Sequence, residues 1–185
     1  MAWRKLQEIE TNTYRNDTVP KRLRLVKCGH PYDPAMPEIR ELAEGETHRA
    51  ARALLELRPH RGPAGALVAQ ADAQRAAGYR LVASFDEGED DAAGVAGFRL
   101  AENLAWGRHL YVDDLVTRAD RRGRGHGGAL MRWLGVQACR AGCDELHLDS
   151  GVGADRQDAH RLYFNTGLRI ASYHFQRPVG AGDRP

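Results

Sequence analysis

The chain predicts an α/β domain in which helices flank a mixed, largely antiparallel sheet. Segments of alternating apolar and polar residues in the middle of the chain indicate strands joined by turns, and such strands pair antiparallel. Nearer the C-terminus a strand, a helix and another strand follow one another, and this connection joins parallel strands by a right-handed crossover. Longer segments with apolar residues at helical spacing supply the helices.

The first third of the chain predicts an arm, a strand and helices. Residues 1–20 are polar and uneven in pattern, which favours a flexible arm, and RLRLVKC at residues 22–28 alternates enough for a first strand. Between residues 37 and 57 apolar residues recur at helical spacing, with Gly45 as a break into two helices. An alanine-rich helix over residues 63–77 follows and ends at a glycine.

A hairpin and a further strand occupy the middle of the chain. Residues 79–85 alternate, the acidic turn DEGEDDAAG follows, and VAGFRL at residues 95–100 returns as the second strand. We interpret the acidic turn as a solvated loop and assign it no function. HLYVDDLVT at residues 109–117 predicts the next strand of the sheet.

Helices and strands alternate in the C-terminal part. A helix with one apolar face is expected over residues 124–141, and a short strand at residues 145–150. A helix over residues 155–166 and a final strand at residues 168–175 complete the chain.

Composition argues against several classes of protein. A net charge of +2 with 28% charged residues is too small a bias for nucleic-acid binding. No stretch approaches the roughly 20 apolar residues of a membrane span, and the N-terminus has no apolar signal core. Three cysteines are too few for a disulfide framework. We therefore expect a cytoplasmic protein with one domain over residues 21–178 and a C-terminal tail over residues 179–185.

A glycine-rich, basic stretch separates the strand at residues 109–117 from the helix that follows. RRGRGHGG contains four glycines, Gly123, Gly125, Gly127 and Gly128. Glycines at such a junction leave backbone N–H groups uncovered, and the helix N-terminus adds a partial positive charge, so the stretch suits a phosphate. Arg122 and Arg124 can add charge and bidentate donors. The alternative is a flexible basic loop without a ligand.

Two motifs resemble the signatures of the GNAT superfamily of acyl-coenzyme A N-acetyltransferases. RRGRGHGGALM is similar to the Arg/Gln-x-x-Gly-x-Gly/Ala signature, carried here by Arg122, Gly125 and Gly127. AHRLYFNTGL resembles the second signature, Ala-x-x-Leu-Tyr-x-x-x-Gly-Phe, with Leu168 in place of the phenylalanine. The similarity covers roughly residues 79–176, and RQDAHRLY also looks like a subgroup that includes aminoalkylphosphonate acetyltransferases.

The resemblance implies a fold, a cofactor and a reaction. It implies a GNAT-like sheet with a splayed central parallel pair, and acetyl-coenzyme A bound with its pyrophosphate on the glycine-rich stretch. A primary amine, that of a small molecule, would take the acetyl group by direct attack in a ternary complex. The implied cofactor contacts are Leu115, Val116, Thr117, Arg122, Gly123, Arg124, Gly125, His126, Gly127, Gly128 and Arg156. Arg156 stands where many members carry an asparagine.

The strand at residues 109–117 carries an irregularity. Its apolar alternation runs through Leu110 and Val112 and resumes only at Leu115. Either a β-bulge accommodates an extra residue or the strand is buried on both faces. The resemblance favours the bulge and implies that pantetheine pairs with the backbone of residues 115–117, where a freed N–H can polarise the thioester carbonyl.

Asp113 and Asp114 lie inside this strand. Adjacent strand residues point to opposite faces, so one of the two carboxylates is expected to face the cleft. An exposed surface pair is the alternative, but a charge within an apolar strand needs a partner. The resemblance implies that Asp113 is the base for the amine proton and that Asp114 positions the amine.

Tyr163 lies on the helix predicted over residues 155–166. Core packing is one role open to it. The resemblance implies another, in which the phenol protonates the departing coenzyme A thiolate.

Two classes of function remain open. The first is an acetyl-coenzyme A-dependent N-acetyltransferase, and the second is a non-catalytic coenzyme A-binding sensor or interaction module. An acetyltransferase for a protein amine is a further alternative. The histidines show no metal-ligand spacing, so no metal site is expected. We expect no nucleic-acid or membrane partner and leave a homodimer open.

Overall fold

The structure is a computed structural model and describes residues 37–179 of the chain. Its strands are β1 (Glu38–Glu41), β2 (Arg80–Phe85), β3 (Gly94–Asn103), β4 (Gly107–Thr117) and β5 (Glu145–Leu148). Its helices are α1 (Ala51–Leu57), α2 (Ala64–Arg75), α3 (His126–Arg140) and α4 (Gln157–Asn165), with short 3₁₀ turns η1 (Thr47–Ala50), η2 (Pro59–Arg61), η3 (Ala119–Arg121) and η4 (Ala154–Arg156). The arm expected at residues 1–20 and the strand expected at residues 22–28 lie outside the described residues.

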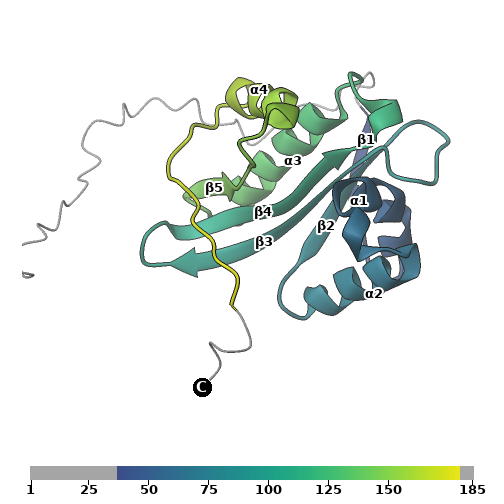
Figure 1. Ribbon diagram of the computed structural model, residues 1–185, viewed down its shortest axis with the longest axis horizontal. Coiled ribbons are helices and arrows are strands. Elements are labelled where there is room, and N and C mark those ends of the chain that lie inside the picture. Colours follow the sequence, from purple (N-terminus) through teal and green to yellow (C-terminus); the bar gives the residue numbers. More distant parts are fainter. Residues whose placement is uncertain (1–36, 180–185) are drawn as a thin grey trace, which may run out of the picture.

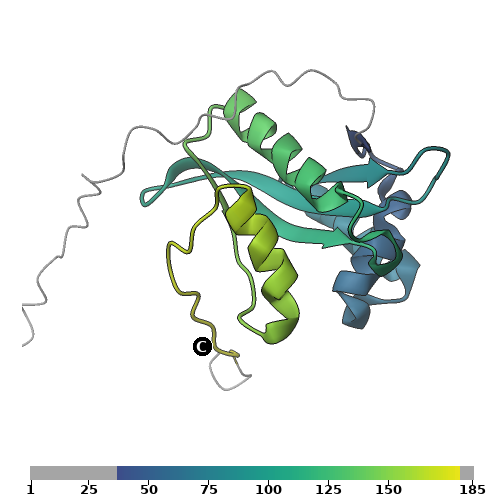
Figure 2. The same cartoon turned by 90° about the horizontal axis from the view of Figure 1, so that it is seen from above.

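One mixed sheet organises these elements (Figure 1). Its strand order is β1-β2-β3-β4-β5, with antiparallel pairing among the first four strands and parallel pairing between β4 and β5. Helices α1 and α2 lie on one side of the sheet and α3 lies on the other (Figure 2). The prediction of a mixed, largely antiparallel sheet flanked by helices is confirmed.

Each face of the sheet carries its own hydrophobic core. Alternation along β2 supplies both, because Leu81 and Ala83 pack with α1 and α2 whereas Val82 packs with α3. Leu130 and Leu134, one turn apart on α3, are fully buried in the second core. Burying each such leucine contributes about 1.5–3 kcal/mol, so the two cores hold β4 firmly between the helical layers.

The first part of the segment predicted as helical at residues 37–57 is a strand. Four residues between Pro37 and the turn at Gly45 pair with β2 as β1, and Ile39 packs into the core on the α3 side. The spacing of Ile39 and Leu42 imitates a helix, but a helix this short is unstable, whereas sheet pairing satisfies the backbone. The predicted break at Gly45 is confirmed, with φ of +83°, and α1 follows it.

Most other elements agree with the sequence prediction and differ by a few residues at their ends. The helix expected over residues 124–141 is α3, which begins at His126 because Gly125 adopts a left-handed conformation with φ of +88°. The helix expected over residues 155–166 is η4 followed by α4.

The final strand predicted at residues 168–175 is wrong. Within the described range this segment has no strand partner, and its side chains Tyr173 and Phe175 are exposed. Alternation of apolar and polar residues favours a strand. A strand also needs a neighbouring strand that pairs with its backbone N–H and C=O groups. Among residues 37–179, β5, the strand at that edge of the sheet, pairs with β4 alone.

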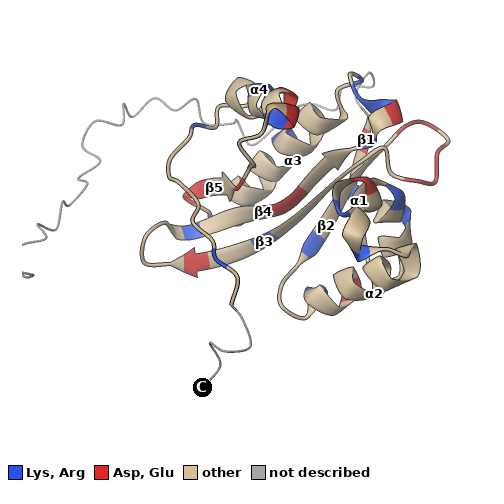
Figure 3. Cartoon of the chain, viewed as in Figure 1, with Lys and Arg blue, Asp and Glu red and all other residues tan. Residues whose placement is uncertain are grey.

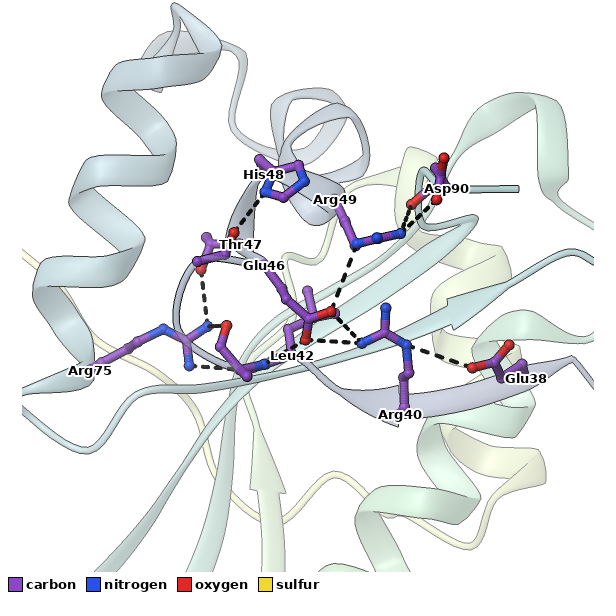
Figure 4. A network of polar contacts seen from close by, with 11 residues as sticks. Glu38, Arg40, Leu42, Glu46, Thr47, His48, Arg49, Arg75 and Asp90 are labelled. Carbon is purple, nitrogen blue, oxygen red and sulfur yellow. Dashed lines mark hydrogen bonds and ion pairs between the residues drawn. The ribbon is translucent and has the colours of Figure 1, made fainter. Parts of the chain in front are cut away.

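A polar network fixes the entry to α1 (Figure 4). Arg75 of α2 donates to the carbonyl oxygen of Leu42 at 3.1 Å and to the hydroxyl of Thr47 at 2.9 Å. Across the turn, Arg40 of β1 donates to the carboxylate of Glu46 at 2.9 Å. The network ties β1, η1 and α2 together, and it therefore sets the position of α1, whose C-terminal end reaches the candidate site.

Candidate active site

A β-bulge interrupts β4 at its two aspartates. In the pairing with β3, Gly97 lies opposite Asp114 and the next residue, Phe98, lies opposite Val112. Asp113 is therefore the extra residue on β4. The bulge expected from the broken apolar alternation is confirmed, and the alternative of a regular strand with two buried faces is wrong.

β4 and β5 separate at the same point. Their parallel pairing runs from His109 with Glu145 to Val112 with Leu148 and stops there. A cavity of about 290 Å³ lies at the separation and is lined by both strands, by the C-terminal end of α1 and by α4. The splayed pair implied by the resemblance is thus present, and the bulge marks where it begins.

Asp113 and Asp114 both turn to the side of the sheet that α1 and α2 cover, so the prediction that they point to opposite faces is wrong. Asp114 accepts a hydrogen bond of 2.8 Å from the hydroxyl of Tyr79, and Asp113 lies 3.5 Å from the guanidinium of Arg99. The bulge is the physical reason, because an extra residue interrupts the alternation of side chains. The ribbon of β4 is coloured red at these two aspartates in Figure 3.

The surroundings of Asp113 favour its protonated form. Burial raises the pKa of its carboxyl group, Arg99 opposes that shift, and the charge of Asp114 adds to it. Its Oδ2 is buried and accepts no hydrogen bond from the described residues. A carboxyl group with a raised pKa and an unused oxygen is suited to take up a proton.

Tyr79 and Arg99 hold the two carboxylates, and the sequence analysis missed both. Tyr79 stands where the strand alternation calls for a core residue, and it is buried, but its hydroxyl reaches Asp114 across Gly97. A side-chain carbon on Gly97 would lie 2.0 Å from that hydroxyl, so only glycine leaves it room. Burial, followed by the charge of Asp114, raises the pKa of Tyr79, so this phenol remains a hydrogen-bond donor.

A second cavity of about 440 Å³ lies between the same carboxylates and the pair of helices α1 and α2. Leu54 of α1 and Leu67 of α2 form part of its apolar wall. Arg58, directly after α1, and Asp113 line both cavities, so the two spaces meet at the bulge.

Tyr163 lies on α4 and lines the first cavity together with Asp113. The side chain is 8% exposed, and its hydroxyl has no hydrogen-bond partner among residues 37–179. His160, one turn earlier, instead contacts the hydroxyl of Ser150 at 3.1 Å and the carbonyl oxygen of Gly151 at 2.9 Å. His160 therefore ties α4 to the loop after β5 and leaves the Tyr163 hydroxyl free to meet a ligand.

Arg156 and Asp149 complete the wall of the first cavity. Arg156 stands at the N-terminus of α4, and its Nε is buried without a hydrogen-bond acceptor in the described part of the chain. Asp149, which the sequence analysis passed over, accepts a hydrogen bond from Tyr111 and lies 3.2 Å from His174. Only its position directly after β5 could have indicated it.

The glycine-rich stretch forms a turn that leads into α3. Gly123 and Gly125 have φ of +77° and +88°, a region that favours glycine. Gly127 is needed for a different reason, because a side-chain carbon there would lie 3.0 Å from Leu162 of α4. Gly128 has open space on its side, with only Arg132 within 3.5 Å.

This turn presents unused donors at a helix N-terminus. The first backbone bond of α3 runs from the N–H of Ala129 to the carbonyl of Gly125, and no N–H group of residues 123–128 donates to another described residue. Arg122 adds a guanidinium that no carboxylate in residues 37–179 pairs with. Free N–H groups, the helix dipole and an unpaired guanidinium fit a phosphate or pyrophosphate group.

The remaining residues implied as cofactor contacts differ in whether their side chain or only their backbone can reach a ligand. Leu115 lines the first cavity with its side chain. Val116 is buried in the core beside α1 and α2, so it can offer only its backbone. The carbonyl oxygen of Thr117 accepts a hydrogen bond of 3.4 Å from Arg122. We call the turn of residues 122–128, which fits a phosphate group, the cradle. His126 is 1% exposed, so its ring cannot reach a ligand bound there.

The acidic turn after β2, to which the sequence analysis gave no function, braces this cradle (Figure 3). Asp86 lies 3.2 Å from His126, 3.0 Å from Arg121 and 3.7 Å from Arg124. Burial lowers the pKa of His126, although Asp86 opposes that shift. The opposite charges of DEGEDD and RRGR were a usable signal for this contact.

We expect Gly125→Asp to weaken coenzyme A binding by roughly 10- to 100-fold, the cost of losing hydrogen bonds to a charged group and adding a like charge. No atom lies within 4 Å of the new side-chain carbon, so the substitution causes no clash, but the φ of +88° strains the new residue locally. Calorimetry with coenzyme A measures the effect. Gly142→Asp is the matched control, because Gly142 has φ of +67°, equally open space and a place at the other end of α3. Equal affinity in both variants would remove the cradle assignment.

We expect Asp86→Asn to raise the KM for acetyl-coenzyme A roughly three- to tenfold with little change in kcat, since the neutral amide no longer restrains the arginines beside the cradle. Glu87→Gln, one residue further along the same exposed turn, is the control. The same KM in both variants would show that Asp86 does not position the cradle.

Among the described residues, no helix has the length and apolar character needed to cross a membrane. The same residues contain no cluster of three or more histidine, cysteine, aspartate or glutamate side chains arranged to hold a metal ion.

Known proteins resemble this chain in sequence and in fold. The uncharacterized N-acetyltransferase YhdJ of Bacillus subtilis (strain 168) is 42% identical over 74 residues, which is 40% of this chain and 51% of that protein. The match therefore spans about half of that relative's length. The ribosomal-protein-alanine N-acetyltransferase of Brucella melitensis biovar Abortus 2308 superposes with a TM-score of 0.66 at 20% identity, over 77% of this chain and 99% of that chain.

AAC(6')-Iy, solved in complex with the bisubstrate analogue CoA-S-monomethyl-acetylneamine, superposes with a TM-score of 0.64 at 14% identity, over 77% of this chain and 98% of that chain. Identities this low establish only the shared fold. The model of the acetyltransferase (GNAT) family matches residues 38–167, which include both aspartates, the cradle and Tyr163. With the splayed strands, the bulge and this match together, the chain belongs to the GNAT acetyltransferase family.

Proposed function

We propose that this protein transfers the acetyl group of acetyl-coenzyme A to a primary amine of a small molecule, by direct attack in a ternary complex. The observation that carries the proposal is the meeting of two cavities at Asp113. One cavity lies between the splayed strands and contains Tyr163, and the other opens between α1, α2 and the carboxylates. Two reactants can therefore approach one point from different sides.

Acetyl-coenzyme A fits the residues on the first side. The cradle of residues 122–128 would hold the pyrophosphate, and the backbone of residues 115–117, which β5 does not pair with, would bind the pantetheine arm. Arg156 can contact the cofactor from the N-terminus of α4. When bound, acetyl-coenzyme A would supply an activated acetyl thioester.

Asp113 and Asp114 serve the amine. An amine arrives as an ammonium ion and must lose a proton before it can attack. Asp114, fixed by Tyr79, attracts and orients the cation, and Asp113, with a raised pKa and a free oxygen, takes the proton.

Tyr163 serves the departing thiolate. Tyr163 lines the cavity between the strands, and its hydroxyl has no hydrogen-bond partner among the described residues, so it can donate a proton or a hydrogen bond to sulfur. Core packing alone would not require a hydroxyl at this position.

A screen of small primary amines for thiol release from acetyl-coenzyme A tests the proposal. We expect turnover with at least one class of amine by the wild type, and strongly reduced turnover by Gly125→Asp at low cofactor concentration. Tight coenzyme A binding without thiol release for any amine would favour the sensor function instead. Thiol release only with peptide amines would favour a protein substrate.

A further inference from the structure

Arg58 occupies the meeting point of the two cavities. It follows α1 directly and precedes η2, and its side chain lines both cavities. Its Nε and Nη2 each lie 3.0 Å from Oδ1 of Asp114, and Nη2 also donates to the carbonyl oxygen of Asp113 at 3.3 Å. The guanidinium thus sits against the oxygen atoms that an ammonium ion would need.

Both oxygens of Asp114 already have partners in this arrangement. Its Oδ2 accepts the hydroxyl of Tyr79 and its Oδ1 accepts Arg58. Asp113 Oδ1 lies 3.5 Å from Arg99, and its Oδ2 accepts no hydrogen bond from the described residues. Each of the two carboxylates therefore has a guanidinium group beside it before any acceptor arrives.

An entering ammonium ion has two routes. If Arg58 stays, three cations share two carboxylates and like charges meet at close range, which is unfavourable. If Arg58 leaves, the ammonium takes its place and the charge balance is kept. The side chain of Arg58 is 46% exposed whereas that of Asp114 is 17% exposed, so the guanidinium can turn to solvent at small cost while the carboxylate stays.

We propose that Arg58 is a specificity-determining residue that fills the acceptor's ammonium subsite and must be displaced by the substrate amine. This inference rests on the proposed function, because it assigns the acceptor subsite to Asp114. Binding of any acceptor then includes the exchange of one ion pair for another. An amine gains affinity only when its own contacts exceed those that Arg58 gives up.

The proposal predicts that removing the guanidinium of Arg58 tightens the binding of an ammonium ion, and that removing another nearby arginine does not. Arg58→Met keeps a flexible apolar side chain and removes the competitor. We expect the Kd of n-butylamine, measured by calorimetry with coenzyme A present, to fall roughly fivefold or more, as for removal of a partly exposed competing charge. Arg58→Lys keeps a charge without the guanidinium geometry. Its Kd for n-butylamine should lie between that of the wild type and that of Arg58→Met.

Arg61→Met is the matched control. Arg61 lines the same second cavity and carries the same charge, but no described carboxylate pairs with it. Its removal should change the Kd by much less than that of Arg58. An equal fall in the Kd of n-butylamine in both variants would show that only the overall charge of the cavity matters. That result would overturn the proposal.

The measurement separates this inference from the function on which it rests. Acetyl transfer by the wild type together with weaker or absent n-butylamine binding by Arg58→Met would contradict the role of Arg58 and leave the function standing. Tighter binding by Arg58→Met without acetyl transfer to any amine would leave the subsite standing and contradict the function. If Arg58 instead assisted deprotonation of the amine, kcat would fall in Arg58→Met and its pH profile would shift, which would also overturn the proposal.

Discussion

Tyr163→Phe is expected to lower kcat by about 10²–10⁴, the usual range for removal of a general acid. The substitution keeps the buried ring of Tyr163, which lines the first cavity, and deletes only its hydroxyl. The KM for acetyl-coenzyme A should change little, because the lost interaction is made mainly in the transition state. Steady-state kinetics with an amine found in the screen measures both quantities.

Thermal unfolding of the same variant separates catalysis from packing. The hydroxyl makes no hydrogen bond to residues 37–179, so Tm should stay close to that of the wild type. Tyr173→Phe is the matched control, since it removes an exposed hydroxyl outside both cavities. A normal kcat with a lowered Tm in Tyr163→Phe would show that Tyr163 only packs.

Asp113→Asn is expected to lower kcat by about 10²–10⁴ at neutral pH and to recover part of that loss at high pH. The wild-type rate should rise with pH as Asp113 ionises, and this rise should lie above the usual range of an aspartate because burial raises the pKa of its carboxyl group. The variant has no such group, so its rate should follow deprotonation of the free amine. A pH–rate profile of both proteins tests this.

The raised pKa also fixes the sign of the stability effect. Folding disfavours the ionised form of Asp113, so its charge reduces stability increasingly as pH rises from the unfolded pKa to the folded pKa. At pH 7 the neutral asparagine should therefore leave Tm unchanged or higher. An equal loss of rate at every pH, or a lowered Tm, would instead assign Asp113 to substrate binding or to structure.

Local sequence patterns were enough for the elements that carry the chemistry. The missing step in the alternation between Val112 and Leu115 left open a bulge or a strand buried on both faces, and the resemblance to the family favoured the bulge, which the structure contains. The apolar face of residues 124–141 predicted α3, and only its start differs, because Gly125 adopts the left-handed conformation just before His126. Each of these patterns lies within a short stretch of the sequence and does not depend on contacts with distant residues.

Long-range contacts decided what the sequence analysis missed. Whether residues 38–41 become strand or helix depends on the free edge of β2, which their own pattern does not contain. The segment at residues 168–175 has the pattern of a strand but no partner in the described part of the chain. Local propensity is overridden in the first case and is insufficient in the second.

The environment of the carboxylates was also beyond local patterns. Arg58 and Tyr79 precede Asp114 by 56 and 35 residues, and neither belongs to a recognisable motif. Strand alternation placed the aspartates on opposite faces, and the bulge that the same analysis predicted should have revised that orientation. A bulge changes the direction of side chains as well as the pairing of the backbone.

A single-turnover reaction with acetyl-coenzyme A labelled in its acetyl group tests the account most directly. Excess wild-type protein, the labelled thioester and an amine from the screen are mixed, quenched and analysed by mass spectrometry of both amine and protein. The account predicts one labelled acetyl group on the amine nitrogen for each coenzyme A released, and no labelled protein when the amine is left out. Label that accumulates on the protein, or that stays in the thioester with every amine tried, would contradict direct transfer at the bulge of β4.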